Sequence, residues 1–518
     1  MKITCYGGVN EIGGNKILVE FPSGRVLLDF GVSFKCRERF YEEYLAPRTN
    51  SQLCDYLRLG ILPRVDGLYR EDALTPLGDP DLLGRSAPLW QIEVQCAEDY
   101  QRDRGKPPVD ALLLTHGHDD HFGLIGFLGH LPIYCSPQTH TLLEAAVSVG
   151  NYSGCERDVL RISRRVLQPN KGGFFPGAPK IAAGDEEPRH IHLFEPGQPF
   201  TLQENSAITV QPVAVGHSVP GSVAFVIRAD GQTVVYSGDI RFHGRWHFDP
   251  LESLGGLQPD VLLLEGTRIT SQEHDDETRV LEELVRAIHQ TQGLAMIGFR
   301  WKDVERYETM KEAAEAVGRE LVIFPRLAYL LHQLGYDLES EPGVYVYLER
   351  SRSLLYSPAD YVYDKYKAGY QAHWLKGKKP ETPHLERGVT ALDLNREPER
   401  YVFQLDYWRF NNLLDIKPPA GSSYIRASTE PFNEEMELSD ERLHNWLKHF
   451  GINPEQGYQP IQIHASGHAS GPELLQFARA IEPKTLIPIH TEYPEIYSKE
   501  LGDLCEVRLP QEGEPLEF

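Results

Sequence analysis

Residues 111–121, ALLLTHGHDDH, decide the fold that we expect for this chain. The apolar run ALLL predicts a buried strand, and the polar cluster that follows would lie at the C-terminal end of that strand. His116, His118 and Asp120 alternate, so on an extended segment their side chains point to one side. His121 begins the helix predicted next and turns toward a neighbouring point. One short loop can therefore face two metal ions.

This loop is more typical of a metal site than of a structural motif. A single histidine on a strand is usually a satisfied core or surface residue, whereas several histidines and a carboxylate so close together reverse that expectation. Imidazole nitrogens and carboxylate oxygens suit zinc, and a catalytic zinc site keeps one position open for water. The loop therefore predicts a catalytic metal centre.

Other predicted strands end in residues of the same kind. These strands lie at 26–29, 208–215, 233–237, 261–264 and 485–489. Asp29 ends the first of them, and the others are followed closely by His217, Asp239, Glu265 and His490. We expect these strand ends to converge on the same site as the histidine loop.

The composition is that of a globular protein of at least two domains, with 518 residues, 41% of them hydrophobic and 25% charged. The net charge of −23 argues against indiscriminate coating of nucleic acid but allows a local basic groove. The seven cysteines contain no CxxC pair, so neither a disulfide framework nor a cysteine zinc site is indicated. We expect a cytoplasmic protein, because we find neither a targeting signal nor an apolar run long enough to span a membrane.

The middle of the chain predicts a separate domain. After Glu265 the apolar pattern changes to a helical face at 280–288, followed by strands at 294–299 and 321–324 with a helix between them. Strand, helix, strand indicates a parallel α/β unit.

We therefore predict a first domain formed by residues 1–267 and 455–518, with an α/β domain inserted at 268–454. The irregular segment between residues 30 and 115 is an insertion of its own. A place near the site and a solvated surface elaboration are equally good interpretations of this segment.

The loop HGHDDH resembles the HxHxDH signature of the metallo-β-lactamase superfamily. Three further motifs resemble those of the β-CASP nucleases in that superfamily: Glu265 in LLLEGT, His468 in HASGHAS and His490 in LIPIHTEY. With GGVNEIGGN at 7–15, they are similar to the ribonuclease J family. The resemblance implies an α/β protein, namely a metallo-β-lactamase αββα sandwich with an inserted α/β β-CASP domain.

The resemblance also implies a two-zinc centre, with manganese as an alternative metal. One zinc ion would be bound by His116, His118 and His217, the other by Asp120, His121 and His490, with Asp239 bridging the two. Asp29 corresponds to a carboxylate that supports the ligand loop without binding metal.

The resemblance further implies the catalytic residues and the substrate. His468 would act as general-acid support, oriented by Glu265, and Asp120 belongs to the catalytic set. A histidine at the position of His490 goes with RNA-acting members of the group, so single-stranded RNA is the implied substrate. It would be cut exonucleolytically from the 5′ end, with endonucleolytic cuts as a further mode. No membrane is implied. The resemblance does not carry over the oligomeric state, and a homodimer stays open.

Contacts to the substrate are predicted away from the metals. The loop YIRASTEPFNEE stands where the family has a Gly-Ser-Gln loop, so Ser428 and Thr429 are the candidates there. The other candidates are Ser466 and Arg306, and the basic runs contain Arg161, Arg164, Arg165, Lys376, Lys378 and Lys379.

Two alternative functions stay open. A small-molecule hydrolase for a lactone, thioester or cyclic nucleotide would use the same metal centre, but the pair Glu265 and His468 argues against it. A non-catalytic RNA-binding subunit is also conceivable, although every ligand position is filled. Cleavage assays with labelled RNA and DNA would separate these functions.

Overall fold

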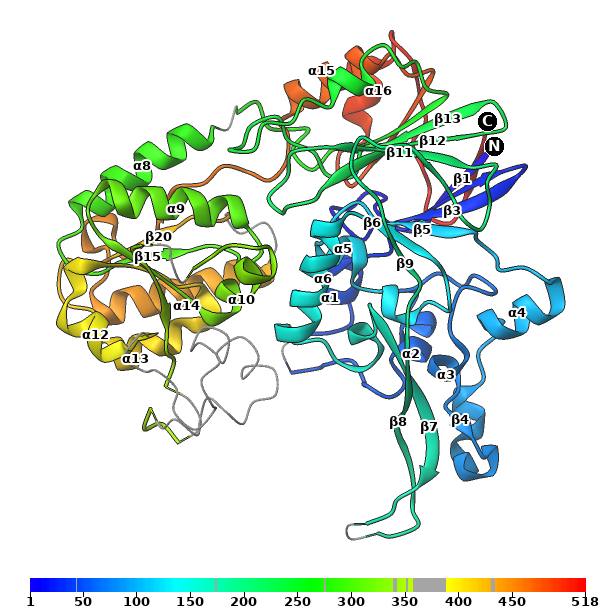
Figure 1. Cartoon of the computed structure of the whole chain (residues 1–518), viewed down its shortest axis with the longest axis horizontal. Coiled ribbons are helices and arrows are strands. Elements are labelled where there is room, and N and C mark those ends of the chain that lie inside the picture. The colour runs from blue at the N-terminus through cyan, green and yellow to red at the C-terminus, as the bar shows by residue number, and fades with distance from the viewer. Residues whose placement is uncertain are drawn as a thin grey trace. The chain divides into compact units, whose positions relative to one another are not determined.

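The computed structural model describes residues 1–42, 44–172, 175–273, 276–338, 342–350, 353–356, 388–429 and 434–518. They form two compact units (Figure 1). The first unit consists of Met1–Phe242, Phe248–Glu273 and His468–Phe518, and the second unit of His243–His247 and His274–Gly467. The chain therefore leaves the first unit and returns to it.

The first unit contains two seven-stranded sheets. The first sheet has the order β24 (Pro515–Glu517), β1 (Lys2–Cys5), β2 (Ile17–Phe21), β3 (Gly24–Leu28), β5 (Ala111–Leu113), β6 (Ile133–Cys135) and β9 (Ile191–Leu193). β1, β2 and β3 pair antiparallel, whereas β3, β5, β6 and β9 run parallel. The predicted strand that precedes the histidine loop is β5, and it is fully buried.

The second sheet combines strands from the middle of the chain with two strands near its C-terminus. Its order is β10 (Phe200–Thr201), β11 (Thr209–Ala214), β12 (Val223–Ala229), β13 (Gln232–Tyr236), β14 (Val261–Glu265), β22 (Thr485–Ile489) and β23 (Glu506–Val507). β13, β14 and β22 are parallel neighbours. Their C-terminal ends therefore lie together at one edge of the sheet, as the sequence predicted.

The two sheets enclose a common core. Val19 and Leu113 of the first sheet belong to the same buried cluster as Phe225 and Ile487 of the second. Along each strand, successive side chains point alternately into this core and to the opposite face of the sheet.

Helices cover the outer faces of the sheets. On the second sheet, Leu474 of α15 (Gly471–Ile481) and Tyr497 of α16 (Glu495–Leu501) pack against strand residues such as Leu262. α5 (Asp119–Phe122) and α6 (Pro137–Val149) lie along the first sheet (Figure 1). This is the expected αββα sandwich.

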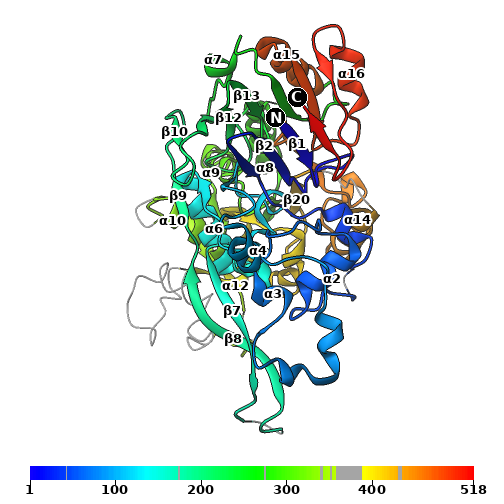
Figure 2. The same ribbon diagram turned by 90° about the vertical axis from the view of Figure 1, so that its right-hand side faces the viewer.

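The segment between β3 and β5 folds onto the first unit. It contains α1 (Phe34–Glu38), α2 (Gln52–Leu59), α3 (Glu71–Leu74), β4 (Leu77–Gly78), a 3₁₀ segment (Pro80–Trp90) and α4 (Ala97–Arg104). β4 pairs with β7 (Arg161–Pro169), which forms a long ribbon with β8 (Pro179–Pro188) that extends beyond α2 and α3 (Figure 2). Arg70 stabilises the position of this segment on the first unit. Its buried guanidinium lies 2.6 Å from the Asp72 carboxylate and 2.7 Å from that of Asp158.

The second unit is built on a seven-stranded parallel sheet. Its order is β18 (Gly388–Val389), β17 (Val344–Tyr347), β16 (Glu320–Ile323), β19 (Tyr401–Gln404), β15 (Ala295–Gly298), β20 (Ser423–Arg426) and β21 (Ile461–Gln462). The helices of this unit include α8 (Glu277–Gln290), α9 (Val304–Ala316), α10 (Pro325–Gln333), α12 (Ala391–Arg396), α13 (Leu413–Ile416) and α14 (Glu434–Phe450).

The helical face predicted after Glu265 corresponds to α8. The Asp276 side chain accepts a hydrogen bond from Thr278 N at the start of this helix, and Val280, Leu284 and Ile288 are buried. The α/β expectation for the middle of the chain is therefore confirmed. No helix in the described part of the chain is long and apolar enough to cross a membrane.

Candidate metal centre

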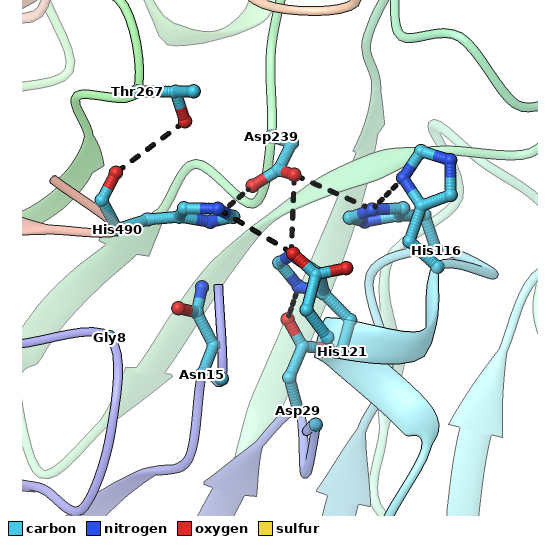
Figure 3. Close-up of polar contacts among 12 residues, drawn as sticks. Gly8, Asn15, Asp29, His116, His121, Asp239, Thr267 and His490 are labelled. Carbon is cyan, nitrogen blue, oxygen red and sulfur yellow. Dashed lines mark hydrogen bonds and ion pairs between the residues drawn. The ribbon is translucent and has the colours of Figure 1, made fainter. Parts of the chain in front are cut away.

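The predicted ligands converge in the first unit (Figure 3). The ligands form three groups, and within each group the ligand atoms lie within 4.8 Å of one another. The first group is His116, His118, His217 and Asp239, the second is Asp120, His121, Asp239 and His490, and the third is Asp239, Glu265 and His468. Asp239, which follows β13, is common to all three.

In the first group, nitrogen atoms of three histidines face one another beside the Asp239 carboxylate. His118 Nδ1 lies 3.2 Å from His116 Nε2 and 3.0 Å from His217 Nε2. Asp239 Oδ2 is 3.6 Å from His116 Nε2 and 3.7 Å from His217 Nε2. Burial, followed by the neighbouring His121 ring, lowers the pKa of His116 well below its ordinary value. A neutral imidazole is the form that binds a metal.

The second group joins residues from distant parts of the sequence. His121 Nε2 lies 3.2 Å from Asp239 Oδ2, and His490 Nδ1 lies 2.9 Å from Asp239 Oδ1. Asp120 Oδ2 is 3.7 Å from His490 Nε2 and 3.9 Å from His121 Nε2. Burial favours the neutral acid of Asp239, yet the His121 and His490 rings outweigh burial and hold its pKa well below the ordinary value.

Several of these buried atoms lie close to one another but form no well-directed hydrogen bond among the described residues. They are Asp239 Oδ1, His121 Nε2, and Nδ1 and Nε2 of His490. Buried polar atoms normally have a partner, and a bound ion is one explanation when they do not. Nitrogen and carboxylate donors that face one another around a common centre fit a divalent metal ion.

Asp29 holds the ligand loop from below. Its carboxylate accepts hydrogen bonds from Thr115 N (2.8 Å), Thr115 Oγ1 (2.9 Å) and the Tyr236 hydroxyl (2.6 Å). It also lies 2.7 Å from His121 Nδ1, which donates to it. His121 therefore presents Nε2 to Asp239, and Asp29 contacts the ligand loop at Thr115 and His121.

The third group contains the predicted acid–base pair. Nδ1 of His468 donates to the carboxylate of the fully buried Glu265, at 3.0 and 3.1 Å from its two oxygens. Glu265 is held in turn by Ile240 N (2.8 Å) and Thr267 N (3.1 Å). Burial lowers the pKa of His468, but the Glu265 and Asp239 carboxylates outweigh burial and raise it to about 9. Nε2 of this ring lies 4.0 Å from Asp239 Oδ2.

Four of the predicted substrate contacts lie in the second unit, namely Arg306, Ser428, Thr429 and Ser466. The Ser466 carbonyl is 2.9 Å from His243 Nε2, and the Ser428 carbonyl accepts a hydrogen bond from Gln462 Nε2 (2.8 Å). Thr429 is exposed after β20. Lys376, Lys378 and Lys379 lie outside the described residues, whereas Arg161, Arg164 and Arg165 lie on β7.

Arg306 lies inside the second unit rather than on its surface. Its guanidinium is fully buried and donates to Glu277 Oε1 (2.8 Å) and to the Ala465 carbonyl (3.1 Å). In this conformation Arg306 supports the segment that leads to His468, and its contact with RNA stays a prediction.

Sequence reasoning did not assign the support network of the site. Tyr236 bonds Asp29, and its hydroxyl accepts a hydrogen bond from Asn15 Nδ2 at 2.9 Å. Lys16 is buried at the start of the second strand of the chain. The sequence features that could have indicated these contacts are the motif GGVNEIGGN and the lysine that follows it.

Comparison with known protein families gives three matches. The Metallo-beta-lactamase superfamily matches residues 83–135, the Beta-lactamase superfamily domain matches 165–301, and the Zn-dependent metallo-hydrolase RNA specificity domain matches 459–501. The last match contains both His468 and His490.

The chain is also similar in sequence to individual proteins. The chain is 25% identical to "Ribonuclease J" of Sinorhizobium meliloti over 401 residues, which cover 74% of this chain and 58% of that protein. It is 22% identical to "Ribonuclease J" of Pyrococcus abyssi over 340 residues, or 63% of this chain and 59% of that protein. It thus spans less than two thirds of the length of these relatives.

A solved structure shares the fold along the whole chain. It is a protein of unknown function from Enterococcus faecalis V583, with a TM-score of 0.66 and 20% identity, and the match covers 100% of this chain and 99% of that one.

Proposed function

We propose that this ribonuclease J-like chain of the metallo-β-lactamase superfamily is a metal-dependent ribonuclease that hydrolyses single-stranded RNA. The observation that carries the proposal is the position of Asp239, whose carboxylate lies in all three groups and so joins two sets of ligands to the pair of Glu265 and His468. The RNA specificity match over residues 459–501 supports RNA as the substrate.

We propose that two zinc ions, or manganese ions in their place, are bound here. His116, His118 and His217 would hold one ion, Asp120, His121 and His490 the other, and Asp239 would bridge them. When bound, such a pair of ions activates a water molecule as the nucleophile and neutralises charge on the phosphate. The proposal is supported by the donor set, which consists of histidine nitrogens and carboxylate oxygens, most of them buried.

The residues of the chain supply the proton that the reaction needs. Hydrolysis adds the oxygen of water to phosphorus and breaks the bond to the 3′-oxygen of the neighbouring nucleotide, which leaves as an alkoxide unless it receives a proton. His468 donates Nδ1–H to Glu265, so Nε2 of the cationic ring would carry the proton that the leaving oxygen receives. Glu265 keeps the ring cationic and oriented, and the products are a 5′-phosphate and a 3′-hydroxyl.

Further parts of the proposal rest on the resemblance. The second unit would be the β-CASP domain and would bind RNA near Ser428, Thr429 and Ser466. Degradation would start at the 5′ end, with internal cuts as a second mode. The excess of acidic residues fits a protein that binds RNA at a confined site rather than over its whole surface.

The test is cleavage of end-labelled and internally labelled RNA and DNA with 5′-hydroxyl, monophosphate or triphosphate ends by the metal-loaded protein. Asp120→Ala is expected to abolish cleavage. Asp260→Ala is the matched control, because Asp260 precedes β14 and pairs with Lys484 at 2.7 Å. Full RNA cleavage by Asp120→Ala at equal metal content would refute the proposal. Hydrolysis of a lactone, thioester or cyclic nucleotide without any cleavage of RNA would point to a small-molecule hydrolase instead.

A further inference from the structure

The segment at residues 7–15, GGVNEIGGN, lies under the second group of ligands, and we call it the glycine loop. It connects β1 to β2. Gly8, Gly13 and Gly14 have positive φ angles of 72°, 81° and 73°, a conformation that favours glycine. Figure 3 shows Gly8 and Asn15 of this loop beside His490 and Asp29.

Lys16 joins the glycine loop to the turn after β3. The side chain is 1% exposed, and its ammonium donates to the carbonyls of Gly14 (2.6 Å) and Gly31 (3.1 Å). Gly31 N in turn donates to the Asn15 carbonyl (3.0 Å). Burial of an ammonium group is costly, and here the charge stabilises the alignment of two loops.

Both loops contact Asp120 directly. Asn15 N donates to the Asp120 carbonyl at 3.2 Å. A Cβ atom on Gly13 would lie 2.6 Å from Asp120 Oδ2, and one on Gly31 would lie 1.7 Å from the Asp120 carbonyl oxygen. Gly13 therefore allows the close approach of the Asp120 carboxylate, and Gly31 allows that of the Asp120 backbone.

The glycine loop also holds His490. His490 N donates to the Gly8 carbonyl (2.7 Å), and Glu11 forms a β-bridge with Thr491. His490 has a φ of 53°, a strained conformation for a residue with a side chain, which persists only when its surroundings hold it. Glu11 braces this contact, since its carboxylate accepts a hydrogen bond from Gly8 N (3.1 Å).

The first group is held by other elements. Thr115 Oγ1 lies 3.0 Å from His116 Nδ1. His217 follows Gly216, which forms a β-bridge with Arg241. These contacts come from β5 and from the segments after β11 and β13. The two groups share Asp239, but the contacts of the glycine loop are with Asp120 and His490 of the second group.

We propose that the glycine loop and Lys16 form a positioning device for the second metal ion. They set the separation of 3.7 Å between Asp120 and His490, so the affinity of the second group for metal depends on Lys16, whereas that of the first group does not. This inference rests on the proposed two-ion function. Lys16 acts through Gly14 and Gly31 and is a positioning residue.

The test is titration of the metal-free full chain with Co²⁺, followed by calorimetry and visible absorption. Lys16→Met is expected to raise the dissociation constant of the second ion at least about 10-fold, the loss typical of residues that support ligands, and to leave the first ion bound. Arg189→Met is the matched control, because Arg189 is a buried cation that donates to four backbone carbonyls away from this site.

A second variant covers the case in which Lys16→Met does not fold. Gly13→Ala should also weaken only the second ion, whereas Gly231→Ala, at a φ of 74° with no atom within 4 Å of the new Cβ, should bind both ions normally. Equal weakening of both ions by Gly13→Ala, or unchanged affinity, would overturn the inference. A wild-type protein that binds only one Co²⁺ would instead contradict the two-ion proposal on which the inference rests.

Discussion

Replacement of Asp29 by asparagine tests whether this carboxylate orients a ligand. Asp29 is fully buried, has a φ of 53° and accepts from Thr115, Tyr236 and His121. Asparagine tolerates this φ as well as aspartate does, so Asp29→Asn changes the charge and the hydrogen bonding but not the backbone requirement.

The size of the effect follows from the donors that lose their acceptor. An amide has one oxygen, whereas the carboxylate uses both, so at least one buried donor faces an NH₂ group. An unsatisfied buried donor costs about 1–3 kcal/mol, and the hydrogen bond from His121 is charge-assisted, worth about 1.5–3 kcal/mol. We expect the free energy of unfolding of the metal-free protein to fall by about 3 kcal/mol. His121 also loses its fixed orientation, so the affinity for the second metal ion should fall about 10- to 100-fold.

The assay combines urea unfolding of the metal-free protein with zinc titration of the folded protein. Asp110→Asn is the matched control, because Asp110 precedes β5 and its carboxylate accepts from Arg25 N (2.7 Å) at the opposite end of the same strand. A variant that loses stability as expected but binds the second ion with unchanged affinity would refute the reasoning, because His121 would then not depend on Asp29 for its orientation.

Three further predictions concern His468, Glu265 and Arg70. His468→Ala should slow RNA cleavage about 10²- to 10⁴-fold with normal metal content by elemental analysis, and a loss of bound metal instead would make His468 a ligand. Wild-type cleavage, which needs cationic His468, should fall as pH rises through the His468 pKa of about 9. Glu265→Gln should shift this loss to lower pH, because the neutral amide no longer favours the cation; an unshifted pH profile would contradict the acid role. Arg70→Met should lower the free energy of unfolding by about 3–5 kcal/mol, since Asp72 and Asp158 would stay buried without their cation. Zinc affinity by titration should not change.

The convergence of the ligands could be predicted because each one follows a strand. The apolar period identifies β13, β14 and β22, and their parallel pairing brings their C-terminal ends to one edge of the second sheet. It also identifies β5 of the first sheet, which precedes the histidine loop. The alternation in HGHDDH then suffices to place His116, His118 and Asp120 on one loop. In this part of the chain local pattern and global fold agree.

The supporting contacts could not be predicted, because they depend on spatial neighbours rather than on periodicity. The Lys16 ammonium donates to the backbone carbonyls of Gly14 and Gly31, and no side-chain pattern in the sequence marks such acceptors. Arg306 shows the opposite case: it was predicted to contact the substrate, whereas Glu277 and Ala465 hold its guanidinium inside the second unit. A charge in the sequence gives no information about its burial.

The two groups of ligands differ in how much of the chain they need. The first group is complete between residues 116 and 239, after β5 of the first sheet and after β11 and β13 of the second. The second group needs His490, which is placed only when β22 adds to β14 after the whole second unit has been traversed. It also needs the glycine loop, which precedes β2 and holds His490 through Gly8. Loop closure over such a distance is entropically costly. The second group therefore depends on the glycine loop and on β22, in addition to the loop that carries Asp120 and His121.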